Sequence, residues 1–322
     1  MKFTTITAAL CAAAIAVPAV AQETRQPSTG ERILGSILNR VLGPEQTAEE
    51  ETSTTVPAED IVAAETAVET AAPTIDVILA DTRRDGDRAR DQYRNPAETL
   101  EFFRVGPQMT VLEYGPGGGW YTRVLAPYLA AEGTYVALNN DSDARTYNSA
   151  EAEQRAKSWT SRFKASVADM TGTSTDEVTA FEIDEIPEDA AGTVDRALIF
   201  RSMHGLWNND EVDSTLGAMR TLLADDGMVG VVQHRAPSSA SWSDVNPARG
   251  YMRQADVIAM FQLHGFELVG TSEVNANPRD PANWEGGVWT LPPVLRYGDE
   301  NRAQYEAIGE SDRMTLLFRK AS

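Results

Sequence analysis

Short apolar runs alternate with amphipathic stretches from about residue 110 to the end of the chain. Apolar runs bounded by turn residues predict buried strands, and apolar residues at spacings of three and four predict helices. The expected strands cover 110–114, 134–138, 178–183, 194–200, 228–233, 266–274 and 314–319. The expected helices between them cover 121–131, 150–163, 210–223 and 254–264.

This alternation predicts an α/β domain, because strands that are joined through helices tend to lie parallel in one sheet. Each expected strand is almost wholly apolar, which is typical of strands covered by helices on both faces. Upstream, residues 75–103 are expected to form helices, one of them starting at Asn95 and Pro96. Residues 275–311, rich in Trp and Pro, form a long insertion before the last strand, and we expect them to be an ordered lid.

The N-terminus has a different character from the rest of the chain. Lys2 precedes the apolar run Ile6–Val20, which ends at a small-x-small site. These features predict a secretory signal peptide, residues 1–21, cleaved after Ala21. No segment has the roughly 20 apolar residues that a membrane span requires. The single cysteine, Cys11, lies within this peptide, so the mature chain would lack thiols, which suits an oxidising compartment. We therefore expect a periplasmic or secreted protein.

Residues 22–75 form an acidic zone of low complexity, in which Glu, Thr, Ala, Pro and Val dominate. Such a segment buries too little surface to offset its ordering entropy, so we expect it to be disordered. Within it, residues 30–42 carry apolar side chains at helical spacing, and we expect a short helix that either forms transiently or binds a protein partner. The net charge of the chain is −20, which disfavours nucleic acid as a partner. The folded domain is expected to span 76–322.

A glycine-rich turn follows the first expected strand, with Gly115, Gly117 and Gly119 at alternating positions. Bare backbone there lets a ligand approach closely, and the N–H groups at the start of the next helix attract an anionic group. The spacing does not match a dinucleotide fingerprint, because Trp120 stands where the third glycine is required. No Lys follows the glycines, which argues against a nucleoside triphosphate. A turn that only makes a tight corner is the alternative.

The string Glu-Tyr-Gly-Pro-Gly-Gly-Gly-Trp-Tyr-Thr at 113–122 resembles motif I of class I S-adenosylmethionine (SAM)-dependent methyltransferases. Together with Arg-Asn-Pro-Ala-Glu-Thr-Leu-Glu-Phe-Phe at 94–103, it resembles a bacterial family of predicted exported methyltransferases. The resemblance covers about residues 81–320. It implies a Rossmann-like, seven-stranded, mostly parallel sheet with helices on both faces and an antiparallel last strand. It also implies methyl transfer from SAM to an oxygen or nitrogen atom of a small molecule.

The resemblance implies roles for residues that follow the expected strands. Glu113 and the glycines would hold the amino-acid part of SAM, although a structural hydrogen bond is the alternative for Glu113. Asn139 stands where the family usually has an acid that binds the ribose, and Asp141 could replace that acid. Asp184 would contact adenine or lie in a solvated acidic loop. The candidate SAM site therefore comprises Glu113, Gly115, Gly117, Gly119, Asn139, Asp141 and Asp184.

His204 follows the fourth expected strand, where the resemblance places the transferred methyl group. It is the candidate general base, because an imidazole pKa of about 6.5 suits proton removal near neutral pH. A structural histidine is the alternative. His234 could line the same pocket, whereas His264 is expected to be structural. Three scattered histidines without clustered carboxylates predict no metal site.

Two observations support an alternative function. An exported enzyme would need a supply of SAM outside the cytoplasm, and Asn139 lacks the charge of the usual acid. The alternative is a methyltransferase-fold protein without catalysis that serves as a ligand-binding or interaction module. Trp120 weakens a third reading, an enzyme that uses NAD or a nucleotide sugar.

Overall fold

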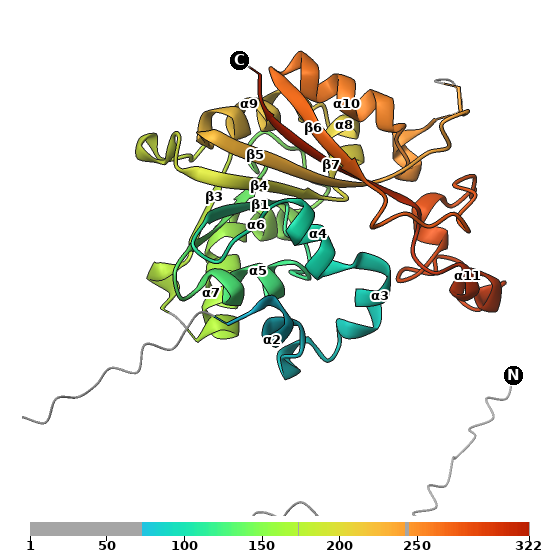
Figure 1. Ribbon diagram of the computed structural model, residues 1–322, viewed down its shortest axis with the longest axis horizontal. Helices are drawn as coiled ribbons and strands as arrows, with labels where there is room; N and C mark the ends of the chain where they lie inside the picture. Colours follow the sequence, from blue (N-terminus) through green and yellow to red (C-terminus); the bar gives the residue numbers. More distant parts are fainter. Residues whose placement is uncertain (1–72, 173, 242–244, 322) are drawn as a thin grey trace, which may run out of the picture. The chain divides into compact units, whose positions relative to one another are not determined.

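The computed structural model describes residues 73–172, 174–241 and 245–321 (Figure 1). The expected signal peptide, the expected helix at 30–42 and nearly all of the low-complexity tail lie outside the described residues. No helix in the described part of the chain is long and apolar enough to cross a membrane.

Seven strands form a single sheet in the order β3-β2-β1-β4-β5-β7-β6. Their bounds are Thr110–Tyr114 (β1), Thr134–Asn139 (β2), Thr179–Glu182 (β3), Val194–Phe200 (β4), Leu223–His234 (β5), Phe266–Ser272 (β6) and Arg313–Lys320 (β7). Strands β1 to β5 pair in parallel, and β7 runs antiparallel to both β5 and β6. The mostly parallel sheet with an antiparallel last strand that we expected is thus confirmed.

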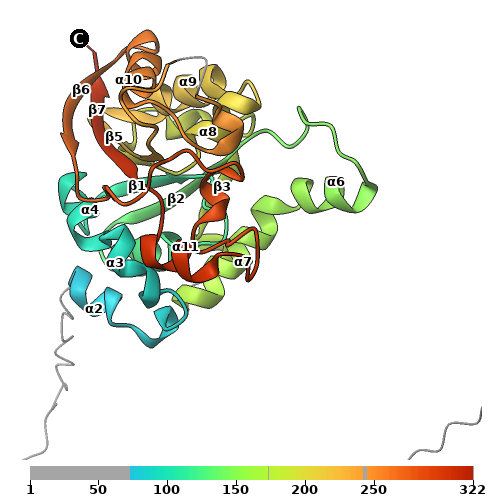
Figure 2. The ribbon, with the colours of Figure 1, turned by 90° about the vertical axis from the view of Figure 1, so that its right-hand side faces the viewer.

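Helices cover both faces of the sheet (Figures 1 and 2). One face packs against α8, α9 and α10, and the other packs against α2, α4, α5 and α7. The helix bounds are Ile75–Leu79 (α2), Asp91–Arg94 (α3), Pro96–Phe102 (α4), Thr122–Leu129 (α5), Ala150–Lys157 (α6), Trp159–Thr171 (α7), Met203–Asn208 (α8), Val212–Leu222 (α9), Gln254–Leu263 (α10) and Arg302–Ile308 (α11). The two apolar layers explain why the central strands lack polar alternation.

Two helical segments differ from the sequence prediction. The single helix expected at 150–163 is two helices, α6 and α7, which meet at Ser158. Helix α6 buries no side chain, so packing does not hold it in line with α7, whereas α7 continues to Thr171 because it buries Val167 and Ala168. Helix α8 lies in a segment for which no helix was expected, and it forms because Met203 and Leu206 reach the core.

The insertion between β6 and β7 is organised around one carboxylate. Asp280 Oδ1 accepts a hydrogen bond from Trp284 Nε1 at 2.8 Å. Asp280 Oδ2 accepts one from the hydroxyl of Tyr251 at 2.9 Å and one from the backbone N–H of Asp312 at 2.9 Å. These bonds tie the insertion to the start of β7 and to the segment before α10. Helix α11, also in the insertion, was not expected.

Candidate functional site

The glycine turn, residues 115–119, leaves β1 at the carboxyl edge of the sheet, beside the point where the strand order reverses. Ligands bind at such points in open α/β sheets. The φ angles of Gly115, Gly117 and Gly119 are 56°, 57° and 72°, which L-residues with a Cβ rarely adopt. A Cβ on Gly117 would have Gly115 O as its nearest neighbour, at 3.8 Å, and one on Gly118 would meet nothing within 4 Å. The turn therefore faces open space, which favours a ligand site over a tight corner.

Two cavities meet at this turn. The glycine-loop cavity, of about 390 Å³, includes Glu113, Gly117, His234 and Trp289 in its lining. The Asn139 cavity, of about 240 Å³, lies on the β2 side. Four residues line both cavities and are called the shared wall: Gly115, Arg201, Ser202 and His204. The predicted glycine turn and the predicted His204 thus lie at one place in the fold.

Glu113 has the structural role that the sequence left open. Its Oε2 accepts hydrogen bonds from Thr122 Oγ1 at 2.8 Å and from the hydroxyl of Tyr135 at 2.7 Å. These bonds connect β1 with α5 and β2. Burial raises the pKa of the Glu113 carboxyl to about 7, and the two hydrogen bonds oppose that shift. The side chain also lines the glycine-loop cavity, so it can contribute to ligand binding as well.

His204 and His234 lie together in the wall of the glycine-loop cavity, with ring centroids 5.7 Å apart. Burial lowers the pKa of both rings, that of His234 strongly, so both are uncharged near neutral pH. Gln233 Nε2 donates to Gly250 O at 2.8 Å and lies 3.4 Å from His204 Nδ1. Because the bond to Gly250 orients the amide, His204 Nδ1 is the acceptor and the ring proton belongs on Nε2. This arrangement makes His204 a hydrogen-bond donor toward a ligand.

The remaining predicted SAM-site residues separate. Asn139 ends β2 and lines the Asn139 cavity. Asp141 lines a third cavity of about 850 Å³, and its Oδ1 accepts the backbone N–H groups of Asp143 and Ala144 at 2.7 and 3.0 Å. Gly119 and Asp184 line none of these three cavities. Gly119 shapes the turn through its positive φ, and Asp184 is an exposed loop residue. Their predicted roles in binding SAM stay predictions.

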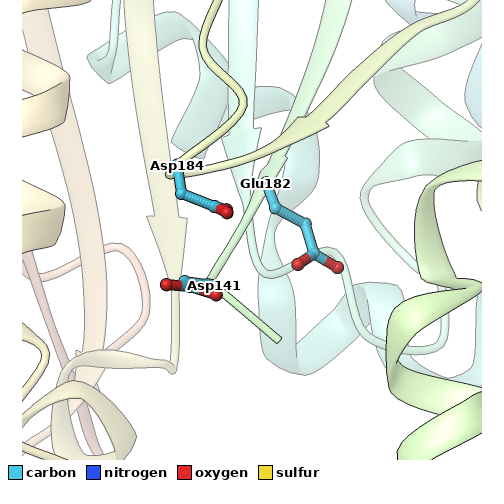
Figure 3. A group of neighbouring side chains, drawn as sticks. All are labelled: Asp141, Glu182 and Asp184. Atoms are coloured by element: carbon cyan, nitrogen blue, oxygen red, sulfur yellow. The ribbon is translucent and has the colours of Figure 1, made fainter. Parts of the chain in front are cut away.

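Asp141, Glu182 and Asp184 lie close together at the ends of β2 and β3, with one oxygen of each within 4.8 Å of the others (Figure 3). The sequence did not reveal this carboxylate cluster, because Asp141 is about 40 residues from the other two along the chain. Oxygen ligands of this kind suit Mg²⁺ or Ca²⁺. Glu182 Oε2, however, accepts the backbone N–H of Ser142 at 2.7 Å, and Asp141 caps its own loop. These backbone bonds hold one oxygen of each residue, whereas Glu182 Oε1 is buried and has no hydrogen-bond partner among the described residues.

Sequence reasoning missed the arginines at this site. Arg90 and Arg201 line the glycine-loop cavity. Trp120 lies in the same lining, and the guanidinium carbons of Arg84 and Arg94 are 5.2 and 4.7 Å from its ring centroid. A signal for Arg201 existed, since a basic residue directly follows the apolar run of β4 in a strongly acidic chain. Arg90 had no such signal, because it lies far upstream of the turn.

No family model and no curated protein matches this chain. Among solved structures, it is similar to a SAM-dependent methyltransferase from Aquifex aeolicus, with 17% identity over 63% of this chain and 94% of that chain and a TM-score of 0.43. It is also similar to the 1,6-didemethyltoxoflavin-N1-methyltransferase of Burkholderia thailandensis, with 13% identity over 74% and 83% and a TM-score of 0.42. A third is a cyclopropane-fatty-acyl-phospholipid synthase-like protein from Lactobacillus casei, with 17% identity over 77% and 98% and a TM-score of 0.42. The strand order and pairing of the described residues give this chain the Rossmann-like fold of class I methyltransferases.

Proposed function

We propose that this chain is a SAM-dependent methyltransferase that acts on an oxygen or nitrogen atom of a small molecule. The observation that supports this most is the shared wall. It joins the glycine turn, where the fold would hold the donor, to the histidines and Trp289 of the glycine-loop cavity. A donor that spans the two cavities would meet there an acceptor that lies beside the histidines and Trp289.

The residues at the turn fit SAM. The backbone at Gly117 and Gly118 is open, and it leads into α5, whose N-terminal N–H groups suit the donor's carboxylate. Glu113 supplies an acidic group at the base of the same cavity. Asn139 can bond ribose hydroxyls through a neutral amide, which both donates and accepts. Asn139 would thus take the place of the usual acid as a weaker, uncharged partner.

When bound, SAM supplies an electrophilic methyl group, which passes to the acceptor with release of a proton and S-adenosylhomocysteine. The protein contributes mainly position, because holding two reactants in line can supply several kcal/mol of the barrier. Trp289, from the insertion, lines the glycine-loop cavity. Its ring centroid lies 5.8 Å from that of His204, and the guanidinium carbon of Arg296 lies 5.0 Å from the Trp289 ring centroid. The insertion then acts as the predicted lid over the acceptor.

The general-base role of His204 stays a prediction. A base needs its lone pair on the ring nitrogen that meets the acceptor, whereas the contact with Gln233 keeps the proton of the neutral ring on Nε2. In this state His204 orients the acceptor by donating from Nε2, and the acceptor's proton leaves to solvent.

A calorimetric titration with SAM and S-adenosylhomocysteine tests the proposal. We expect micromolar binding of both by the wild type, and a loss of tenfold or more in Gly117→Val, because the new side chain fills the open face of the turn. Gly172→Val is the matched control. It also sits at positive φ with nothing within 4 Å, but at the end of α7. It should bind both ligands like the wild type.

Wild-type protein that binds neither compound would refute the proposal and leave the binding or interaction module as the better account. Equal losses in the two glycine variants would show that backbone strain, not occupancy of the turn, explains the loss.

We further propose that the protein is exported and cleaved after Ala21, on the character of residues 1–21. Mass spectrometry of the protein recovered from cells should find a chain that begins at Gln22.

A further inference from the structure

The glycine-loop cavity gathers positive charge in a chain whose net charge is −20. Arg90, Arg123 and Arg201 line it. Arg123 Nη2 is neutralised by Asp87 Oδ1 at 2.9 Å. The other two guanidiniums belong to a larger group of basic residues behind the cavity wall.

In that group, a single carboxylate, that of Glu310, forms ion pairs with three arginines. Glu310 lies 2.9 Å from Arg90, 3.0 Å from Arg94 and 3.2 Å from Arg313. Arg94 Nη1 and Nη2 are buried and have no hydrogen-bond partner among the described residues. Positive charge therefore exceeds negative charge here before Arg201 is counted.

The Arg201 guanidinium has no hydrogen bond or ion pair with any other described residue. Burial lowers its pKa to about 10, and repulsion from Arg313 adds to the effect, so the group still carries its charge near neutral pH. Arg201 is half-buried and lines both cavities, so its charge is accessible to a ligand there. The backbone of Arg201 also has φ 58°, a conformation that is strained for a non-glycine residue and that concentrates at functional sites.

We propose that Arg201 binds a carboxylate or phosphate group of the methyl acceptor, so that the acceptor class is a small organic anion. This inference rests on the proposed methyltransferase function. A planar guanidinium presents paired N–H groups that match two oxygens of either anion. The donor's own carboxylate has a separate site at Gly117, Gly118 and the start of α5. Arg201 lies instead in the shared wall with His204, where the acceptor must come.

The test is a calorimetric titration of the full chain with inorganic phosphate and with benzoate, each with and without saturating S-adenosylhomocysteine. We expect at least one anion to bind the wild type with a dissociation constant on the order of 1 mM, and to bind equally well when S-adenosylhomocysteine is present. Arg201→Gln should weaken that binding by tenfold or more. Arg201→Lys keeps the charge but loses the paired N–H groups of the guanidinium, so its anion affinity should lie between those of the wild type and Arg201→Gln. Arg162→Gln, which removes an exposed arginine of α7, is the matched control.

Unchanged anion affinity in Arg201→Gln, or no binding of either anion by the wild type, would overturn the inference. Displacement of the anion by S-adenosylhomocysteine, with a tenfold loss of S-adenosylhomocysteine affinity in Arg201→Gln, would also overturn it by assigning Arg201 to the donor. Wild-type protein that binds anions through Arg201 but ignores SAM and S-adenosylhomocysteine would support the anion site and refute the methyltransferase proposal. The two failures are therefore distinguishable.

Folding provides a second readout. Arg201→Gln removes a charge without a protein partner, so its melting temperature should equal or exceed that of the wild type. A decrease of about 5 °C or more would indicate that the guanidinium is a structural element, and it would count against a ligand role.

Discussion

The buried carboxyl of Glu113 predicts that stability depends on pH in a way that one substitution removes. Its pKa is raised from 4.5 to about 7, chiefly because burial disfavours the charged form. The folded state therefore binds this proton more tightly than the unfolded state does. The resulting stabilisation is complete below pH 4.5 and is lost as pH rises to 7, which is the direction expected for a carboxyl whose folded pKa is raised.

The size of the effect follows from the difference between 7 and 4.5. A difference of about 2.5 pKa units, at about 1.36 kcal/mol for each, corresponds to about 3 kcal/mol. Glu113→Gln is neutral at every pH, and its amide oxygen can still accept the bonds from Thr122 and Tyr135. Relative to the wild type, the variant should gain up to about 3 kcal/mol of unfolding free energy between pH 5 and pH 8.

Urea unfolding at pH 5, 6, 7 and 8 measures this change. The difference between wild type and variant isolates Glu113, because the other carboxylates are the same in both proteins. Glu98→Gln, at an exposed position of α4, is the control for the loss of a carboxylate as such. A wild-type-minus-variant difference that stays constant across the four pH values would refute the reasoning.

Three further predictions concern packing, the insertion and His204. Gly230→Ala should destabilise the fold by about 1–3 kcal/mol, because its Cβ would lie 2.6 Å from Phe103 Cγ. Chemical denaturation measures this loss of unfolding free energy. The control is Gly217→Ala, whose Cβ would meet nothing within 4 Å, and an equal loss in that variant would contradict the prediction. Asp280→Ala should cost about 2–4 kcal/mol, because four donors lose a buried carboxylate. Limited proteolysis should then cut within 275–311, and an insertion that stays uncut would contradict the role of Asp280 as its anchor. His204→Ala should slow methyl transfer roughly 10- to 100-fold through loss of an orienting donor, and His204→Gln, which retains an N–H, should recover most of that rate. If instead both variants lose the acid limb of the pH–rate profile, His204 is a base.

Local patterns in the sequence were enough to identify the sheet and the glycine turn. Strands β1 and β4 match the expected 110–114 and 194–200, because a buried parallel strand is marked by its own apolar residues. The turn at 115–119 was found for a similar reason, since positive φ at alternating residues requires glycine at those positions. These features are short-range, so a single sequence contains the information that specifies them.

Helix bounds and side-chain partners depended on contacts that the sequence does not display. Whether residues 150–171 form one helix or two was decided by which of them reach the core, and α8 formed because Met203 and Leu206 are buried. The position of Asp184 relative to the cavities also depended on tertiary contacts. Asp184 follows β3 as expected, but it does not line any of the three cavities described above.

The sequence alone therefore determined the fold class, the position of the turn and the place of His204 near it. Only the tertiary structure decided the charge of the cavity. Glu310 and the arginines around it come from the two ends of the domain, and Gln233 sets the proton of His204 from a neighbouring strand. Hydrogen bonds and charge balance depend on distances between residues that are remote in the chain, and folding is what sets those distances.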